Sequence, residues 1–147
     1  MAMTSHQAIV IGAGPGGLAT LAALCDAGIR PNLWIDKTFE GGRLNTLFRE
    51  ISSLFGCHIW FPCVSIIQSV SVPNAVTILE SMDRDRTYEL SSAGDMVCML
   101  VNSILKRPDV QSIQGEVERA SLKGRIWTVS TANKDFTTKL LFCCTGS

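Results

Sequence analysis

The hydrophobic pattern at the N-terminal end of the chain predicts a strand, a helix and a second strand in close succession. Ala8–Ile11 is an uninterrupted apolar run, β-branched after its first residue, as in parallel strands covered on both faces. Leu18–Ala27 repeats apolar residues at helical spacing, and Gly28 ends it. Asn32–Ile35 is a second short apolar run that ends at Asp36. These elements predict one βαβ unit.

The pattern is less regular in the rest of the chain. Glycines and prolines interrupt every long period between residues 38 and 73, which predicts a loop with short helical or extended pieces. Ser92–Asp95 resembles a capping box before an amphipathic helix that ends at Lys106-Arg107 and Pro108. Four short strands are predicted after this helix, three in a β-meander and the last buried on both faces: Val110–Val117, Ile126–Thr131, Phe136–Lys139 and Leu140–Cys144.

Composition narrows the class of protein. The 147 residues carry 13 basic and 13 acidic side chains, so the electrostatic attraction that drives nucleic-acid binding is absent. No apolar run reaches the length of about 18 residues that spans a bilayer, and no secretion signal is visible. We therefore expect one cytoplasmic domain over residues 1–147, with no nucleic-acid or membrane partner. Residues 1–7, His6 included, are expected to fray, and the six cysteines to be reduced and mostly buried.

The chemistry centres on the turn between the first predicted strand and helix. Residues 12–17 read Gly-Ala-Gly-Pro-Gly-Gly and satisfy the pattern G-x-G-x-x-G. Gly12 permits the tight turn, Gly14 lets the backbone approach a diphosphate, and Gly17 lets helix and strand pack closely. The bound anion would rest on free amides at the positive end of the helix dipole. The pattern therefore predicts a dinucleotide site.

Asp36 supports this prediction, because it ends the second strand near the spacing of about 20 residues at which a carboxylate binds an adenosine ribose. The same carboxylate would repel a 2′-phosphate, which favours FAD or NAD over NADP. The alternative is a tight turn with an aspartate that only caps the following segment, and it leaves the three spaced glycines unexplained.

Several segments together resemble the FAD-binding domain of the two-dinucleotide-binding-domain flavoproteins, in particular the flavin-containing monooxygenase-like branch. The segments that carry the resemblance are residues 12–17, Ile35–Lys37, Gly41–Asn45, Phe48–Ser53, Gly115–Val117 and Leu141–Ser147. The resemblance implies an α/β fold, a Rossmann-like FAD/NAD(P)-binding domain with a parallel sheet and a small β-meander. It also implies the cofactor-binding residues Gly12, Gly14, Pro15, Gly16, Gly17, Asp36, Lys37, Gly42, Arg43, Val117 and Gly146.

The implied roles differ along the cofactor. The glycine turn would hold the diphosphate and Asp36 the adenosine ribose, while Val117 would lie where the family's backbone meets the adenine. Arg43 would lie on the flavin side, although a surface cation beside two turn glycines is an equal alternative. No side chain is predicted as a catalytic acid or base.

The departures from the family leave the function open. The chain has no second G-x-G-x-x-G, so no separate NADPH domain is expected, and it resembles a truncated relative or a short protein with its own mode of cofactor binding. The leading prediction is a FAD-dependent, monooxygenase-like oxidoreductase acting on a small organic molecule, reduced by NAD(P)H or by a reductase partner. The alternatives are a non-catalytic FAD/NAD-binding module or partner subunit, and a flavin-assisted isomerase or cyclase without net redox. An uncovered last strand also predicts a homodimer.

The cysteines and tryptophans add weaker candidates. Cys57 and Cys63 are spaced unlike a flavin-linked redox pair and lack a fourth ligand for zinc, so buried thiols are favoured and no metal is predicted. Cys143 and Cys144 point to opposite faces of one strand and are expected in the core. Trp60 is the tryptophan most suited to stack on a cofactor, since Trp34 and Trp127 lie in predicted strands.

Overall fold

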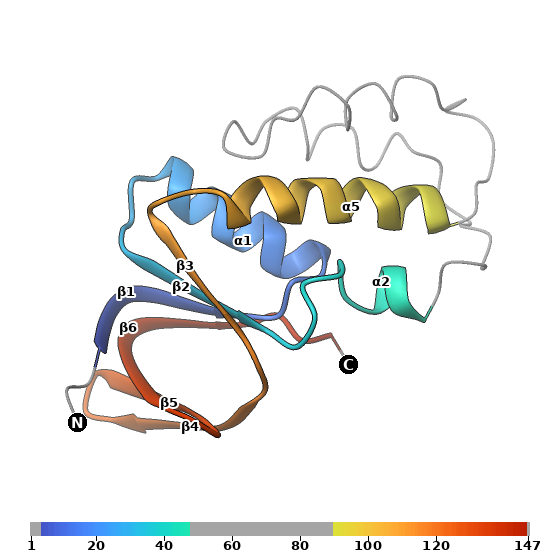
Figure 1. The fold of residues 1–147 in the computed structure, drawn as a ribbon. Helices are drawn as coiled ribbons and strands as arrows, with labels where there is room; N and C mark the ends of the chain where they lie inside the picture. The colour runs from blue at the N-terminus through green and yellow to red at the C-terminus, as the bar shows by residue number, and fades with distance from the viewer. Residues whose placement is uncertain (1–3, 48–89, 147) are drawn as a thin grey trace.

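The computed structural model describes residues 4–47 and 90–146. They form an α/β fold, in which one sheet of parallel and antiparallel strands carries helices on one face (Figure 1). The described helices are α1 (Pro15–Asp26), α2 (Arg43–Thr46) and α5 (Leu90–Leu105), and the strands are β1 (Thr4–Ile11), β2 (Asn32–Asp36), β3 (Val110–Gln114), β4 (Val117–Lys123), β5 (Ile126–Thr131) and β6 (Asp135–Cys143). The strands lie in the order β3-β2-β1-β6-β5-β4. The predicted fold class, a parallel sheet with a small β-meander, is confirmed.

The N-terminal βαβ unit is also confirmed, but its first strand is longer than predicted. β1 runs parallel to β2, with Ala8–Ile11 opposite Asn32–Ile35. The prediction that residues 1–7 fray is wrong for residues 4–7, because β1 begins at Thr4 and its residues Thr4–His6 pair in parallel with Phe136–Thr138 of β6. His6 is consequently buried, and its Nε2 lies 2.9 Å from Oε1 of Gln111.

The two strands predicted at 136–139 and 140–144 are one strand, β6. Its length runs parallel to β1, and only Asp135–Thr138 also pairs with β5. Among the described strands, none pairs with the outer edge of β6 beyond Thr138. Leu140 is 41% exposed there, so the prediction that this strand is buried on both faces is wrong.

The predicted strand 110–117 is two strands at opposite edges of the sheet. β3 runs parallel to β2, whereas β4 pairs antiparallel with β5. The chain crosses between them at Gly115 and Glu116, where the amide of Gly115 donates to the Asp36 carbonyl at 2.9 Å. The β-meander is therefore β4-β5-β6, and β3 belongs to the parallel part of the sheet.

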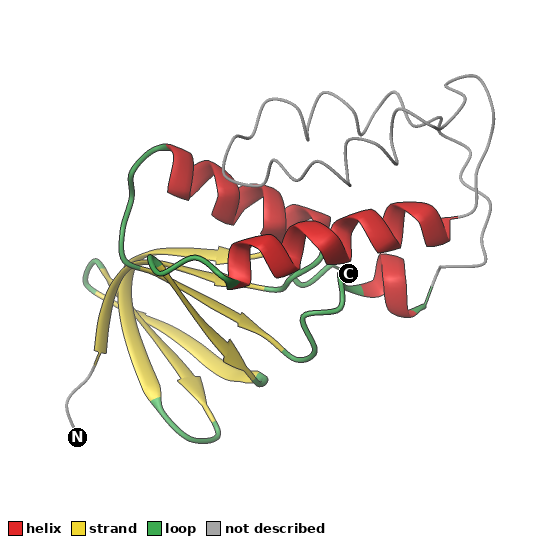
Figure 2. Cartoon of the chain, turned by 45° about the horizontal axis from the view of Figure 1, so that its top comes forward, coloured by secondary structure: helices red, strands yellow, loops and turns green. Residues whose placement is uncertain are grey.

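Helices α1 and α5 lie side by side over one face of the sheet (Figures 1 and 2). The core on this face includes Val10, Trp34, Leu21, Val101 and Ile104, all 0% exposed. α5 already includes Leu90, so Ser92 lies inside the helix and the predicted capping box is wrong. Within residues 4–47 and 90–146, no helix combines the length and apolar character needed to cross a bilayer.

A second core lies on the other face of the sheet, where the meander curls away from the helices (Figure 2). Alternate residues of β1 supply both cores: Ala8 and Val10 face the helices, and Ile9 and Ile11 face the second core. This alternation confirms that β1 is a central strand covered on both faces, and it explains the uninterrupted apolar run.

An ionic cluster joins the loops before β2 and β3. Asp109 accepts hydrogen bonds from Nε and Nη2 of Arg107 at 3.0 and 2.9 Å, and its Oδ2 lies 3.1 Å from Nε of Arg30. The hydrogen bonds from Arg107 are the main reason that the pKa of Asp109 falls below its ordinary value. The cluster therefore contributes stability while Asp109 is ionised.

The described cysteines only partly match the predictions. Cys25 is a buried thiol, and its burial raises its pKa. Cys144 is half-buried but Cys143 is exposed, so the prediction that both are core residues is wrong for Cys143. The predictions for Cys57, Cys63, Trp60 and Phe48–Ser53 concern residues outside the described ranges.

Candidate functional site

The glycine turn between β1 and α1 contains two kinds of glycine, those that packing requires and one that it does not. Gly12 has φ +102°, and a Cβ there would lie 2.4 Å from the Cys144 carbonyl oxygen. A Cβ on Gly17 would lie 1.9 Å from the Gly12 carbonyl oxygen. Packing alone therefore requires Gly12 and Gly17. Gly14 is different, because a Cβ there would meet its nearest atoms at 3.8 Å, an ordinary contact.

The N-terminus of α1 carries amides without acceptors. The helix begins at Pro15, three residues before the predicted start, because proline is favoured at the first helical position. Its N-cap, Gly14, has no side chain to accept a hydrogen bond, and its first turn contains no acidic residue. The first bonded amide is that of Leu18, which donates to the Gly14 carbonyl at 3.0 Å. The amides of Gly16 and Gly17 have no acceptor among the described residues, so together with the helix dipole they favour an anion.

The Asp36 carboxylate lies beside this turn. Its Oδ2 accepts a hydrogen bond from the Ala13 amide at 2.8 Å. Its Oδ1 accepts two, from the amides of Thr38 and Phe39 at 2.9 and 2.7 Å. A carboxylate oxygen has two lone pairs, so Oδ2 keeps one acceptor position for a ligand hydroxyl. The sequence predicts a role for this residue but carries no signal for the asymmetry of its two oxygens.

A backbone hydrogen bond joins Asp36 to the segment Gly115–Val117, where the adenine contact is predicted. Gly115 is bonded to the Asp36 carbonyl, and Val117 begins β4. Lys37 follows Asp36 and Glu116 follows Gly115, and the two side chains form an ion pair with 3.7 Å between Nζ and Oε2. Both side chains are 76% exposed. An ion pair this exposed adds little stability and leaves both charges accessible to a ligand.

Two further predicted segments lie against the glycine turn. A Cβ on Gly42, whose φ is +69°, would lie 2.8 Å from the Gly14 Cα, so the two loops touch. Arg43 follows as the exposed first residue of α2. The amide of Cys144 donates to the Ile11 carbonyl at 2.8 Å, which brings the end of β6 and the following Gly146 to the same edge of the sheet.

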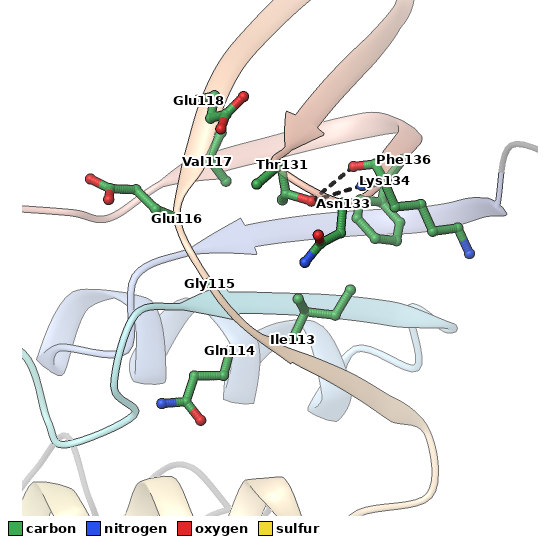
Figure 3. A pocket seen from close by; sticks show the side chains of 11 residues that line it. Ile113, Gln114, Gly115, Glu116, Val117, Glu118, Thr131, Asn133, Lys134 and Phe136 are labelled. Atoms are coloured by element: carbon green, nitrogen blue, oxygen red, sulfur yellow. Dashed lines mark hydrogen bonds between the residues drawn. The ribbon is translucent and has the colours of Figure 1, made fainter.

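A cavity lies elsewhere, between the β3–β4 crossing and the β5–β6 turn (Figure 3). It has a volume of about 710 Å³, and of the predicted site residues only Val117 lines it. Ile113, Val117 and Phe136 supply its apolar lining and belong to, or pack against, the second core. Because it lacks the glycine turn and Asp36, we place the candidate site at the turn. No group of His, Cys, Asp and Glu in the described part of the chain could hold a metal ion.

One residue of the site was not anticipated. Trp34 was predicted to pack in its strand, and it is fully buried, but its Nε1 also donates to the Gly12 carbonyl at 2.9 Å. The sequence carries no signal for this bond, because it depends on how the turn folds back over β2.

Known proteins resemble the chain in sequence and in fold. No protein-family model matches the chain. It is 32% identical to "Monooxygenase AgnR1" of Paecilomyces divaricatus over 156 residues, covering 95% of this chain and 40% of that protein. The chain therefore spans about 40% of the length of the curated relative it matches.

Solved structures with the same fold are more distant in sequence. Cyclohexanone monooxygenase from Rhodococcus sp. Phi1 bound to NADP+ matches with a TM-score of 0.68 at 19% identity, over 99% of this chain and 26% of that one. Bacillithiol disulfide reductase from Staphylococcus aureus matches with a TM-score of 0.64 at 17% identity, over 98% of this chain and 39% of that one. A variant of the flavin monooxygenase from Stenotrophomonas maltophilia gives 0.68 at 15% identity, over 98% and 39%.

These structures show that the chain has a Rossmann-like α/β fold, which it shares with known flavoprotein structures. The resemblance inferred from the sequence is thus confirmed. Within that class, the similarity in sequence is to a monooxygenase.

Proposed function

We propose that this chain is the FAD-binding part of a monooxygenase-like oxidoreductase that acts on a small organic molecule. The observation that carries the proposal is that the amides at the start of α1, which have no acceptor among the described residues, lie beside a carboxylate held in place by backbone hydrogen bonds. Gly16 and Gly17 offer donors to a diphosphate, and Asp36 Oδ2 offers an acceptor to a sugar hydroxyl. An adenine dinucleotide carries both of these ligand groups, a diphosphate and a ribose hydroxyl, next to each other.

The residues present fit this cofactor. Gly14 leaves the amides accessible because it has no side chain. Pro15 follows it in the sequence, and Gly42 lies against it in space. Arg43 and Lys37 are exposed cations that would lie toward the flavin side and the adenosine side respectively. Bound FAD would supply the redox chemistry, while this chain's residues bind and orient it.

The monooxygenase relative favours FAD over NAD, and the Asp36 charge disfavours a 2′-phosphate at this site. Reducing equivalents would come from NAD(P)H or from a reductase partner. The outer edge of β6 beyond Thr138 would be covered by a second copy of the chain in a homodimer. A cytoplasmic location is part of the proposal, supported by the absence of a disulfide among the cysteines of the described residues.

A non-catalytic dinucleotide-binding module is the second candidate. It is favoured by the single G-x-G-x-x-G in these 147 residues. The two candidates differ in whether bound FAD is reduced by NAD(P)H, which bleaches the visible absorbance of the flavin. A flavin-assisted isomerase or cyclase would bind FAD and convert a substrate without net redox.

The experiment is a binding titration of the purified protein with FAD, NAD and NADP. We expect FAD to bind, NAD to bind more tightly than NADP, and Asp36→Asn to weaken FAD binding about tenfold to 100-fold, as for a lost charged hydrogen bond. Asp135→Asn is the matched control, because Asp135 is an exposed aspartate at the start of β6. The proposal would be contradicted if the wild type bound none of the three ligands, or if the Asp36 and Asp135 variants bound FAD with equal affinity.

A further inference from the structure

We propose that Trp34 is a positioning residue of the dinucleotide site, in which the indole N–H fixes the peptide plane from which the glycine turn presents its amides. This inference rests on the proposed function of that turn. Trp34 lies one strand away from the turn, on β2, and would touch no part of a cofactor itself.

Three consecutive residues of β2 hold the first two residues of the turn. Nε1 of Trp34 donates to the Gly12 carbonyl at 2.9 Å, and the Gly12 amide donates to the Ile35 carbonyl at 2.8 Å. Next along the strand, Asp36 accepts from the Ala13 amide at 2.8 Å. The turn is therefore bonded to β2 by one side-chain donor, one backbone acceptor and one carboxylate.

The Trp34 and Asp36 bonds act on one rigid unit. The Gly12 carbonyl and the Ala13 amide belong to the same planar peptide group, so they cannot rotate independently. Trp34 holds the oxygen end of that plane and Asp36 holds the hydrogen end. A rotation that released one bond would break the other, so the pair sets the direction in which the chain enters Gly14 and the first turn of α1.

The Gly12 carbonyl depends on this donor. It faces the start of α1, where a Cβ on Gly17 would lie 1.9 Å away, yet it accepts no helical hydrogen bond, because the first one ends on Gly14. Trp34 is 0% exposed, so water does not reach its side of the bond. A phenylalanine in its place would leave a carbonyl that has no other donor among the described residues, and the peptide plane would be free to turn.

Trp34 also contacts the loop that follows Asp36. Its ring meets the Phe39 ring edge-on, with centroids 5.1 Å apart. Phe39 has φ +56°, in the left-handed region, and its amide donates to Asp36 Oδ1 at 2.7 Å. One buried indole thus touches the diphosphate side and the ribose side of the site, and would keep their separation constant.

The test compares Trp34→Phe with Trp127→Phe, measured well below the melting temperature of each variant. Trp127 is a half-buried tryptophan on β5, outside the site. We expect Trp34→Phe to weaken FAD and ADP alike by about fivefold to tenfold, the effect of one lost hydrogen bond that leaves a buried partner. Trp127→Phe should change both affinities by less than about twofold.

The outcomes separate this inference from the proposed function. Wild-type affinity in Trp34→Phe overturns the inference alone, whereas a wild type that binds neither FAD nor ADP overturns both. If Trp34→Phe does not fold, hydrogen exchange of the wild type decides by NMR. The Trp34 indole N–H should be protected from exchange in the free protein and more so with ADP, and rapid exchange in both states would overturn the inference.

Discussion

Replacing Gly14 by serine should raise the stability of the fold and weaken cofactor binding, two effects of opposite sign that a purely structural glycine would not give. Gly14 is the N-cap of α1, with φ −77° and ψ −176°, a conformation that any residue adopts. A Cβ there meets nothing closer than 3.8 Å. The serine hydroxyl would accept from the amide of Gly16 or Gly17, which is the donor proposed for the diphosphate.

The size of each effect follows from this geometry. Serine caps a helix a few tenths of a kcal/mol better than glycine. Removing a glycine where the backbone is compatible contributes about 0.4–1 kcal/mol more by restricting the unfolded chain. The total of about 1 kcal/mol corresponds to a rise in Tm of roughly 2–4 °C for a domain of this size. Losing one charge-assisted amide–phosphate bond should weaken FAD binding at least about tenfold.

The assay measures Tm by thermal unfolding and FAD affinity by titration, for wild type, Gly14→Ala and Gly14→Ser. Alanine tests the added Cβ without the competing hydroxyl, so its Tm should stay below that of the serine variant. A Gly14→Ser protein that melts higher and still binds FAD with wild-type affinity would refute the assignment of this turn to the diphosphate.

Further predictions concern the fold around the site. Gly17→Ala should prevent folding, because its Cβ would lie 1.9 Å from the Gly12 carbonyl oxygen, whereas Gly16→Ala should fold, since no atom lies within 4 Å; equal melting temperatures would contradict the described turn. Asp109→Asn should lower the unfolding free energy by about 1 kcal/mol near neutral pH. Because hydrogen bonds from Arg107 hold the pKa of Asp109 below its unfolded value, this contribution exists above about pH 4 and disappears as the pH falls through the folded pKa. The gap between wild type and variant in denaturant unfolding should therefore close in acid, and a constant gap would count against the cluster.

The βαβ unit could be predicted because its signals are local. The apolar run of Ala8–Ile11, the helical spacing after Leu18 and the glycines of the turn each lie within a few residues of the feature they specify. Asp36 followed from its position at the end of the second run. Of the predicted site residues outside the turn, Asp36 and Gly42 contact it directly.

The remaining features depend on contacts between distant segments. Val110–Gln114 and Val117–Lys123 alternate in similar ways, and only pairing with β2 or with β5 sends them to opposite edges of the sheet. The 136–143 segment contains a polar centre that looked like a strand end, yet pairing with β1 keeps it extended. The bond from Trp34 to Gly12 likewise exists only once the turn lies over β2.

The most direct test of the central claim is a crystal structure of the protein grown with saturating FAD. The account predicts diphosphate density on the amides of Gly16 and Gly17 and a ribose hydroxyl on Oδ2 of Asp36. FAD bound elsewhere with the glycine turn empty, or no bound FAD at saturation, would contradict it.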